Sequence, residues 1–209
     1  MNKKGILWLV ILASLILGLS GLLIYRLFFF DHFNEPAKKT KVVDRIINYN
    51  YYLEDRDSKL YKTKFNELKA LLKSDDFDYE QYGSLLTELY IIDFYSLDNK
   101  LNKYDVGGLD FILESDQESF KKKAMATYYK NVKDNTYDNR KQKLPQVTKV
   151  NIINVEDTVY KKTNEGYLID VSWEYDSNYD ASNHANITLV KEKQKLVIAK
   201  IETIDSETE

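Results

Sequence analysis

The acid best placed to do chemistry in this sequence is Asp93, which lies in the apolar run IIDFY. We expect that run to form a buried helix, where a carboxylate resists ionisation and can serve as a base in an enclosed pocket. Asp105 and the pair Gly107 and Gly108 follow a short polar connector. Two interpretations stay open: a ligand pocket of Asp93 and Tyr95 with this loop, or a structural network in which a tyrosine hydroxyl or a loop amide satisfies the acid.

Other patterns that carry chemistry are missing from the sequence. An acidic stretch invites a calcium loop, but counting from Asp76 puts Gln81 where that loop needs glycine and Thr87 where it needs glutamate. His32 and His184 are the only histidines, and the absence of cysteine removes disulfides, thiol nucleophiles and thiolate metal sites. We therefore expect no catalytic residue, no metal and no cofactor.

Three helices are predicted ahead of Pro145. Asp57 and Ser58 suit a helix N-cap, and the apolar residues that follow repeat with helical spacing. A second helix from about Tyr79 to Leu97 is apolar around much of its girth and should be central, and a third runs from Asp116 to about Asn135. Leu109, Phe111 and Leu113 alternate like a short strand.

Beyond Pro145 the apolar spacing changes to the period of two that is typical of strands. The pattern predicts four consecutive strands with short connections: Val147–Val155, Tyr167–Tyr175, Asn186–Lys191 and Leu196–Ile204. Short connections favour an antiparallel meander. The fold class is therefore α+β, with three helices packed on a C-terminal antiparallel sheet of about four strands, behind an N-terminal transmembrane helix.

That anchor is the 21-residue segment from Gly5 to Tyr25, which carries no charge. At a helical rise it spans about 31 Å, close to a hydrocarbon core of about 30 Å. A single uncleaved span is our main interpretation, with a cleaved signal peptide and a buried core helix as alternatives. Ser14, Gly18 and Gly21 share one helix face, where small residues allow close helix packing and self-association, although such residues are common in membrane helices.

The anchor sets the expected domain boundaries and location. Residues 1–30 would form a cytoplasmic stub and anchor, 31–56 a charged juxtamembrane stalk with a possible short strand from Ile47 to Leu53, 57–204 the domain, and 205–209 an acidic tail. Basic residues flank both ends of the anchor, so charge alone would keep the domain inside. The short basic N-terminus is instead typical of a signal-anchor, and we expect a single-pass cell-membrane protein with its C-terminal domain extracytoplasmic.

The element order from Leu60 to Ile204 resembles the NTF2-like extracytoplasmic domains of VirB8-type and Gram-positive conjugation membrane proteins. The stretch LYIIDFYSLDNKLNKYDVGG, Leu89 to Gly108, is similar to a segment of single-span membrane proteins of low-GC Gram-positive bacteria. The first resemblance implies a curved sheet covered by helices. The second implies a membrane location and brings no activity with it.

Composition separates the functional hypotheses. The net charge of −3 is well mixed and leaves no basic patch for nucleic acid. Seventeen tyrosines supply rigid area suited to protein contacts, although about half should be core. The first hypothesis is a membrane-anchored scaffold that binds other proteins in a bacterial envelope, division or secretion assembly. The alternatives are an enzymatic or small-ligand pocket around Asp93, and a cell-wall glycan binder with exposed aromatics such as Trp173.

Overall fold

A computed structural model describes residues 40–162, 164–179 and 181–204, together with Ser14, Gly18 and Ser20. The chain divides into two compact units, Met1–Lys38 and Lys39–Glu209. In the first unit the three described residues are helical and exposed, while Gly21 and most of the expected anchor lie outside the described residues. Among the residues described, no helix combines the length and the apolar character that crossing a membrane requires.

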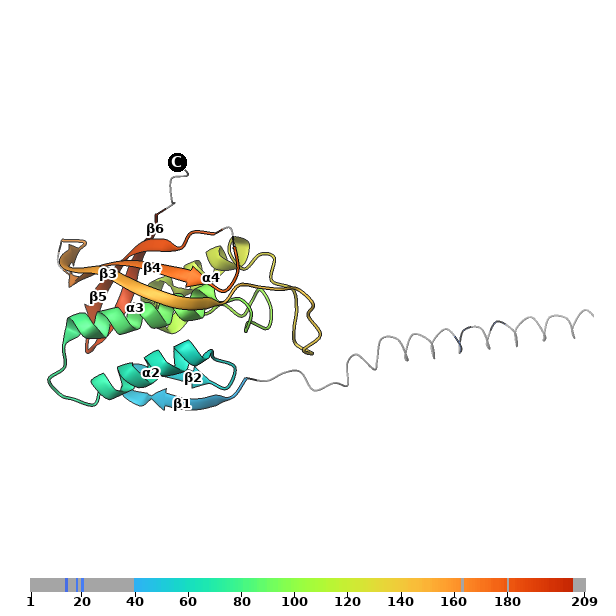
Figure 1. The fold of residues 1–209 in the computed structure, drawn as a ribbon, viewed down its shortest axis with the longest axis horizontal. Coiled ribbons are helices and arrows are strands. Elements are labelled where there is room, and N and C mark those ends of the chain that lie inside the picture. Colours follow the sequence, from blue (N-terminus) through green and yellow to red (C-terminus); the bar gives the residue numbers. More distant parts are fainter. Residues whose placement is uncertain are drawn as a thin grey trace, which may run out of the picture. The chain divides into compact units, whose positions relative to one another are not determined.

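The second unit is α+β: three helices pack with a four-stranded antiparallel sheet, as the sequence predicts, and a two-stranded hairpin precedes them (Figure 1). In chain order the elements are β1 (Val42–Ile46), η3 (Ile47–Tyr49), β2 (Tyr51–Glu54), α2 (Lys59–Leu71), α3 (Tyr79–Tyr95), η4 (Leu109–Phe111), η5 (Glu114–Asp116), α4 (Gln117–Ala126), β3 (Val147–Tyr160), β4 (Asn164–Tyr175), β5 (His184–Glu192) and β6 (Lys195–Thr203).

The predicted meander is confirmed, with strand order β3-β4-β5-β6 and antiparallel pairing throughout. The hairpin of β3 and β4 is longer than expected, because Tyr160 pairs with Asn164. The sequence signal stopped at Val155 because the strand beyond it is largely exposed and polar, so it carries no apolar alternation.

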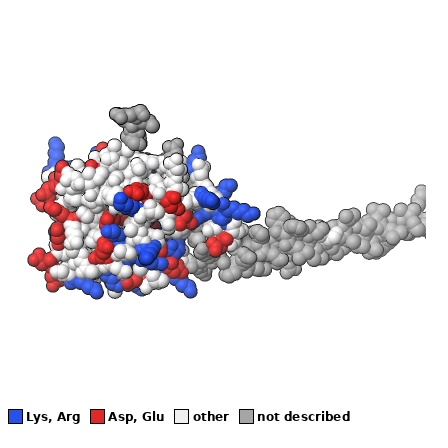
Figure 2. Space-filling model, viewed as in Figure 1, with Lys and Arg blue, Asp and Glu red and all other residues white. Residues whose placement is uncertain are grey.

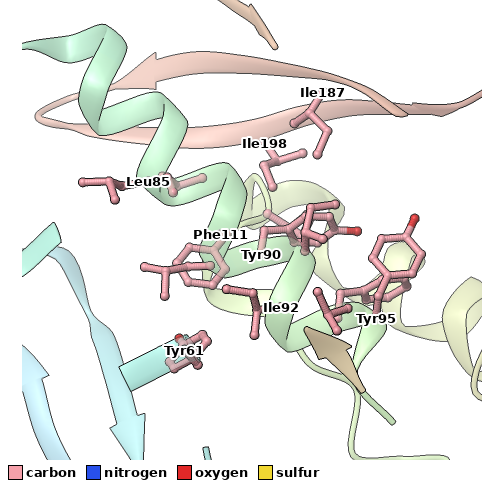
Figure 3. Packing of buried hydrophobic residues seen from close by; sticks show 14 of the residues in the cluster. Tyr61, Leu85, Tyr90, Ile92, Tyr95, Phe111, Ile187 and Ile198 are labelled. Atoms are coloured by element: carbon pink, nitrogen blue, oxygen red, sulfur yellow. The ribbon is translucent and has the colours of Figure 1, made fainter. Parts of the chain in front are cut away.

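Helix α3 is the centre of the core and lies between α2 and the sheet in Figure 1. It begins at an N-cap, Asp78, whose side chain accepts from the Glu80 amide. At Gly83, a Cβ atom would lie 3.1 Å from the Leu189 side chain and 3.3 Å from that of Ile169. The missing side chain therefore allows the helix to approach the sheet closely, and buried aromatic and aliphatic residues fill the rest of the interface (Figure 3).

The described part of the expected stalk contains regular secondary structure. Residues 42–54 form the hairpin of β1 and β2, within the same compact unit as the helices and the sheet. Asn50 takes a left-handed conformation, φ 55°, which reverses the chain after η3. Tyr51 and Leu53 enter the core, whereas Ile47 stays 72% exposed. The single strand expected from Ile47 to Leu53 is thus a turn followed by β2.

Two further predictions needed correction. The strand expected over Leu109–Leu113 begins as the short helix η4, Leu109–Phe111, because Gly108 at φ 73° turns the chain immediately before it, and only the extended end at Ile112 forms a bridge, to Ile198. The third helix ends at Ala126, well before Asn135. The following tyrosines leave the helical path: the Tyr128 hydroxyl donates to the Tyr95 carbonyl and the Tyr129 hydroxyl to the Phe94 carbonyl.

Candidate functional site

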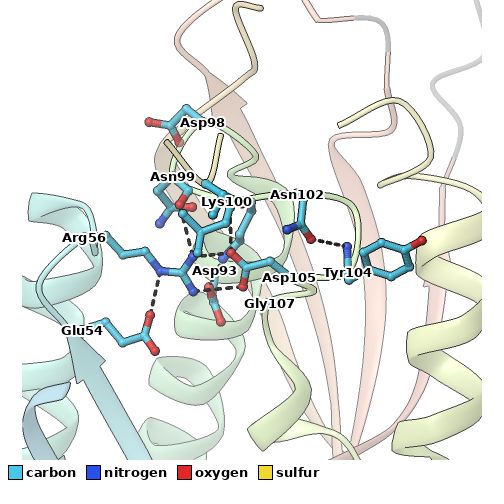
Figure 4. Close-up of polar contacts among 12 residues, drawn as sticks. Glu54, Arg56, Asp93, Asp98, Asn99, Lys100, Asn102, Tyr104, Asp105 and Gly107 are labelled. Carbon is cyan, nitrogen blue, oxygen red and sulfur yellow. Dashed lines mark hydrogen bonds and ion pairs between the residues drawn. The ribbon is translucent and has the colours of Figure 1, made fainter. Parts of the chain in front are cut away.

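Of the concave regions on the described domain, two are candidate functional sites, and the first is a polar cleft of about 340 Å³ between the β1–β2 hairpin and the connector after α3. Five carboxylates and two cations line it: Glu54, Asp57, Asp93, Asp105, Asp110, Arg56 and Lys100. Figure 4 shows Glu54 and Arg56 reaching from the hairpin side toward Asp93, Lys100 and Asp105. The cleft thus collects most of the residues that the sequence singles out around Asp93.

Asp93 itself is paired. One carboxylate oxygen contacts the Lys100 ammonium, and the other accepts from the Gly108 amide at 2.6 Å. The Lys100 side chain is 1% exposed and that of Asp93 is 22% exposed. The neighbouring Gly107 amide donates to the Tyr129 hydroxyl at 3.1 Å. An acid held by an ammonium and a loop amide is fixed in position, whereas the pocket interpretation needs a closed apolar cavity with Asp93 unpaired.

Asp105 belongs to a second ion pair on the same cleft wall. The Arg56 guanidinium donates to both of its carboxylate oxygens, and the same Arg56 contacts Glu54 at 2.7 Å. Burial alone would raise the pKa of Asp105, but its bonds to Arg56 outweigh that effect and hold the pKa below its usual range. Asp105 also accepts from the Leu101 amide at 2.7 Å, so it anchors the connector to the hairpin.

The cleft also holds acids without an ion-pair partner among the described residues. Burial raises the pKa of Asp57 to about 6, although its carboxylate accepts from the Glu54 amide at 2.6 Å. Burial also raises the pKa of Asp110. The cations that line the cleft already serve other acids, and these two carboxylates are stabilised less well.

The sequence did not single out Arg56 or Lys100, which complete this network. Lys100 lies in the polar run LDNKLNK, where nothing in the spacing distinguishes a buried lysine from a solvated one. The signal that could have found them is electrostatic: a buried carboxylate needs a partner, and the candidates are cations near the glycine pair. Tyr95, by contrast, lies outside the cleft and packs against Trp173, with ring centroids 4.4 Å apart.

The second concave region is a groove of about 630 Å³ between α4 and β6. Ser119 and Lys123 contribute from α4, Thr127 from the C-cap of that helix, and Ile201 and Thr203 from β6. Aromatic residues of α3 and α4 complete its wall: Tyr90, Phe94, Tyr95 and Phe120. This groove is nearly twice the volume of the polar cleft and is mainly apolar, which is the usual character of a binding site.

The described tyrosines lie in the interior more often than on the surface. Six tyrosines are buried: Tyr51, Tyr61, Tyr82, Tyr90, Tyr95 and Tyr129. Among the described tyrosines, only Tyr52 and Tyr104 are exposed, and the others are buried or half-buried. Trp173 is 1% exposed, so it is not part of the exposed aromatic groove that glycan binding would require.

The described residues contain no group of three or more acids or histidines arranged to hold a metal ion. On the face seen in Figure 2, acidic and basic side chains are interspersed. Comparison of the chain with protein-family models, with curated proteins and with solved structures finds no match. Function must therefore be argued from the residues and their geometry.

Proposed function

We propose that this chain is a single-span membrane protein whose domain of about residues 39–204 binds other proteins of the bacterial envelope. The anchor is the uncharged segment Gly5–Tyr25, and the very short basic N-terminus before it is typical of a signal-anchor, which favours an extracytoplasmic domain. The helix-covered antiparallel sheet suits an NTF2-like domain of the kind carried by conjugation membrane proteins. The role is that of a scaffold in a division or secretion assembly.

The observation that carries this proposal is the contrast between the two concave regions. In the polar cleft, Asp93 and Asp105 are committed to internal ion pairs: Lys100 ties the connector to α3 through Asp93, and Arg56 ties it to the hairpin side through Asp105. The α4–β6 groove is larger than the polar cleft and mainly apolar, and its α4 wall presents the exposed side chains of Ser119 and Lys123, with Thr127 exposed at the C-cap. An open apolar groove with a polar rim is typical of a surface that binds a partner.

Cross-linking in the native membrane, followed by affinity purification of the full-length chain, tests the proposal. The control for the anchor is a chain limited to Met1–Pro36. The control for the groove is a matched pair on α4: Ser119→Trp fills the groove, while Lys122→Trp places the same side chain at an exposed position outside it. We expect a defined set of envelope proteins with wild type and Lys122→Trp, and its loss with Ser119→Trp. Capture that is identical with all four chains would refute the proposal.

Orientation has its own test, because the chain contains no cysteine. A single Lys122→Cys substitution introduces one thiol on an exposed face of α4. We expect a membrane-impermeant maleimide to label this thiol on intact cells. Labelling only after the membrane is opened would place the domain in the cytoplasm and would exclude an extracytoplasmic partner.

A further inference from the structure

The outer edge of β6 is only partly used by the fold. Its inner edge pairs with β5. On the outer edge, the Leu113 amide donates to the Ile198 carbonyl at 3.0 Å, and Ile112 forms an isolated parallel bridge to Ile198. The chain therefore already adds a short extended segment to this edge, and the segment ends where η5 begins.

Beyond that bridge, the register determines which backbone groups point outward. The Ile204 amide donates to the His184 carbonyl at 2.9 Å, so Ile204 faces β5. Alternation along an antiparallel strand then turns the amide and carbonyl groups of Thr203 and Ile201 away from β5. One extra residue, Ala199, interrupts the register and brings Ile198 to the same outer side.

These outward backbone groups lie beside the groove. Ile201 and Thr203 both line it, and among the described residues no hydrogen bond is found to the outward amide or carbonyl of either. An unpaired strand edge is a template on which another extended chain can add. The α4 wall stands opposite, and apolar side chains such as Phe120 cover the space between, which suits every second side chain of an added strand.

The charges at the rim of the groove indicate which kind of chain can bind there. Lys123 has no acidic partner among the described residues, and it ends the basic run that begins at Lys121. The one acid among the residues that line the groove is Asp116, the N-cap of α4, about two helical turns before Lys123. Lys200 is paired with Glu202 at 2.8 Å. The unpaired ammonium at the rim complements a carboxylate on the incoming chain.

We propose that the groove binds an extended peptide segment of a partner protein, which adds as a strand to β6 at Ile201 and Thr203. The segment carries apolar side chains at alternate positions and a carboxylate that meets Lys123. This inference rests on the proposed function and deepens it, because it names the form in which the partner binds. Backbone hydrogen bonds supply affinity that depends little on sequence, and the groove selects the alternate side chains.

The test uses the full-length protein in lipid nanodiscs and a displayed library of random short peptides. Enriched sequences should alternate apolar and polar residues and should contain acids. The best peptide is then synthesised with N-methyl groups at either the odd or the even amides, and binding is followed by fluorescence anisotropy. Because a strand uses every second amide toward its neighbour, one methylated series should lose about tenfold in affinity per blocked hydrogen bond and the other should lose little.

Variants of the protein test the same backbone hydrogen bonds by changing β6 in place of the peptide. Thr203→Pro removes an outward amide that β5 does not use, and Thr203→Ala retains it. We expect Thr203→Pro to lower the affinity for the peptide by about tenfold, while Thr203→Ala leaves that affinity unchanged. Thermal unfolding shows whether the proline variant is folded. If it is not, the affinities of the methylated peptides for the wild-type protein still test strand addition.

Each result has a definite meaning. Equal affinity of both methylated series, or failure to enrich any peptide, overturns strand addition. If envelope proteins are still captured in a way that Ser119→Trp abolishes, the proposed function stands and only the extended form of the partner is wrong. Concentration-dependent dimerisation of the protein that Thr203→Pro abolishes would make the occupant a second copy and would likewise overturn the proposal.

Discussion

Replacing Asp93 by asparagine should lower the free energy of unfolding sharply, because it orphans a buried cation. The Lys100 side chain is 1% exposed and contacts the Asp93 carboxylate. Removing one partner of a buried ion pair costs about 3–5 kcal/mol, since the remaining charge is left without compensation. The asparagine oxygen can still accept from the Gly108 amide, so we place the cost of Asp93→Asn near the lower end, at about 3 kcal/mol.

Replacing the lysine of this pair, in place of the acid, should lower the free energy of unfolding by less. Lys100→Met removes the buried charge and leaves an apolar chain of similar length. Asp93 keeps the Gly108 amide at 2.6 Å, and its side chain is 22% exposed, so water can solvate it. We expect a loss of about 1 kcal/mol. The double variant should be more stable than Asp93→Asn alone, because the orphaned ammonium is gone.

Urea unfolding at neutral pH measures all three changes. A Trp8→Phe background leaves Trp173 as the only tryptophan, and Trp173 is 1% exposed in the folded domain. Asp75→Asn is the matched control, because Asp75 is an exposed acid at which we expect less than about 0.5 kcal/mol. If Asp93→Asn were as stable as the control, or less harmful than Lys100→Met, the structural account of Asp93 would be refuted.

Three further predictions concern single sites. Burial raises the pKa of Asp57 to about 6, so between about pH 4 and pH 6 the folded state binds more protons than the unfolded state and stability falls as pH rises. In urea unfolding across that range, Asp57→Asn should remove a total fall in the free energy of unfolding of about 1–3 kcal/mol; an unchanged pH dependence would contradict burial of Asp57 as its cause. Gly108→Ala should cost about 1–3 kcal/mol in thermal unfolding, because φ is 73° and a Cβ would lie 2.7 Å from the Tyr90 ring. Ser58→Ala should cost about 1 kcal/mol by the same measurement, because the Ser58 hydroxyl accepts from the Tyr61 amide at 3.1 Å, and retention of full stability would show that this cap is dispensable.

Local patterns were enough for the elements with a clear apolar period. The cap at Ser58, the central helix α3 and the four strands of the meander all follow from spacing that one sequence displays. The β1–β2 hairpin was missed because its turn depends on Asn50 in a left-handed conformation, which composition does not reveal. The third helix was overextended because tyrosine hydroxyls bonded to α3 carbonyls, a tertiary contact, draw the chain after Ala126 away from the helical path.

The same division applies to the candidate sites. The sequence by itself grouped Asp93, Tyr95, Asp105 and the glycine pair, of which all but Tyr95 line the cleft, and it predicts an anchor in the uncharged segment Gly5–Tyr25, because these depend on residue type and near spacing. Only the tertiary structure brought Arg56 to Asp105 and buried Lys100 against Asp93. It alone placed α4 beside β6, since the outward amides of a strand edge follow from register and packing rather than from side-chain pattern.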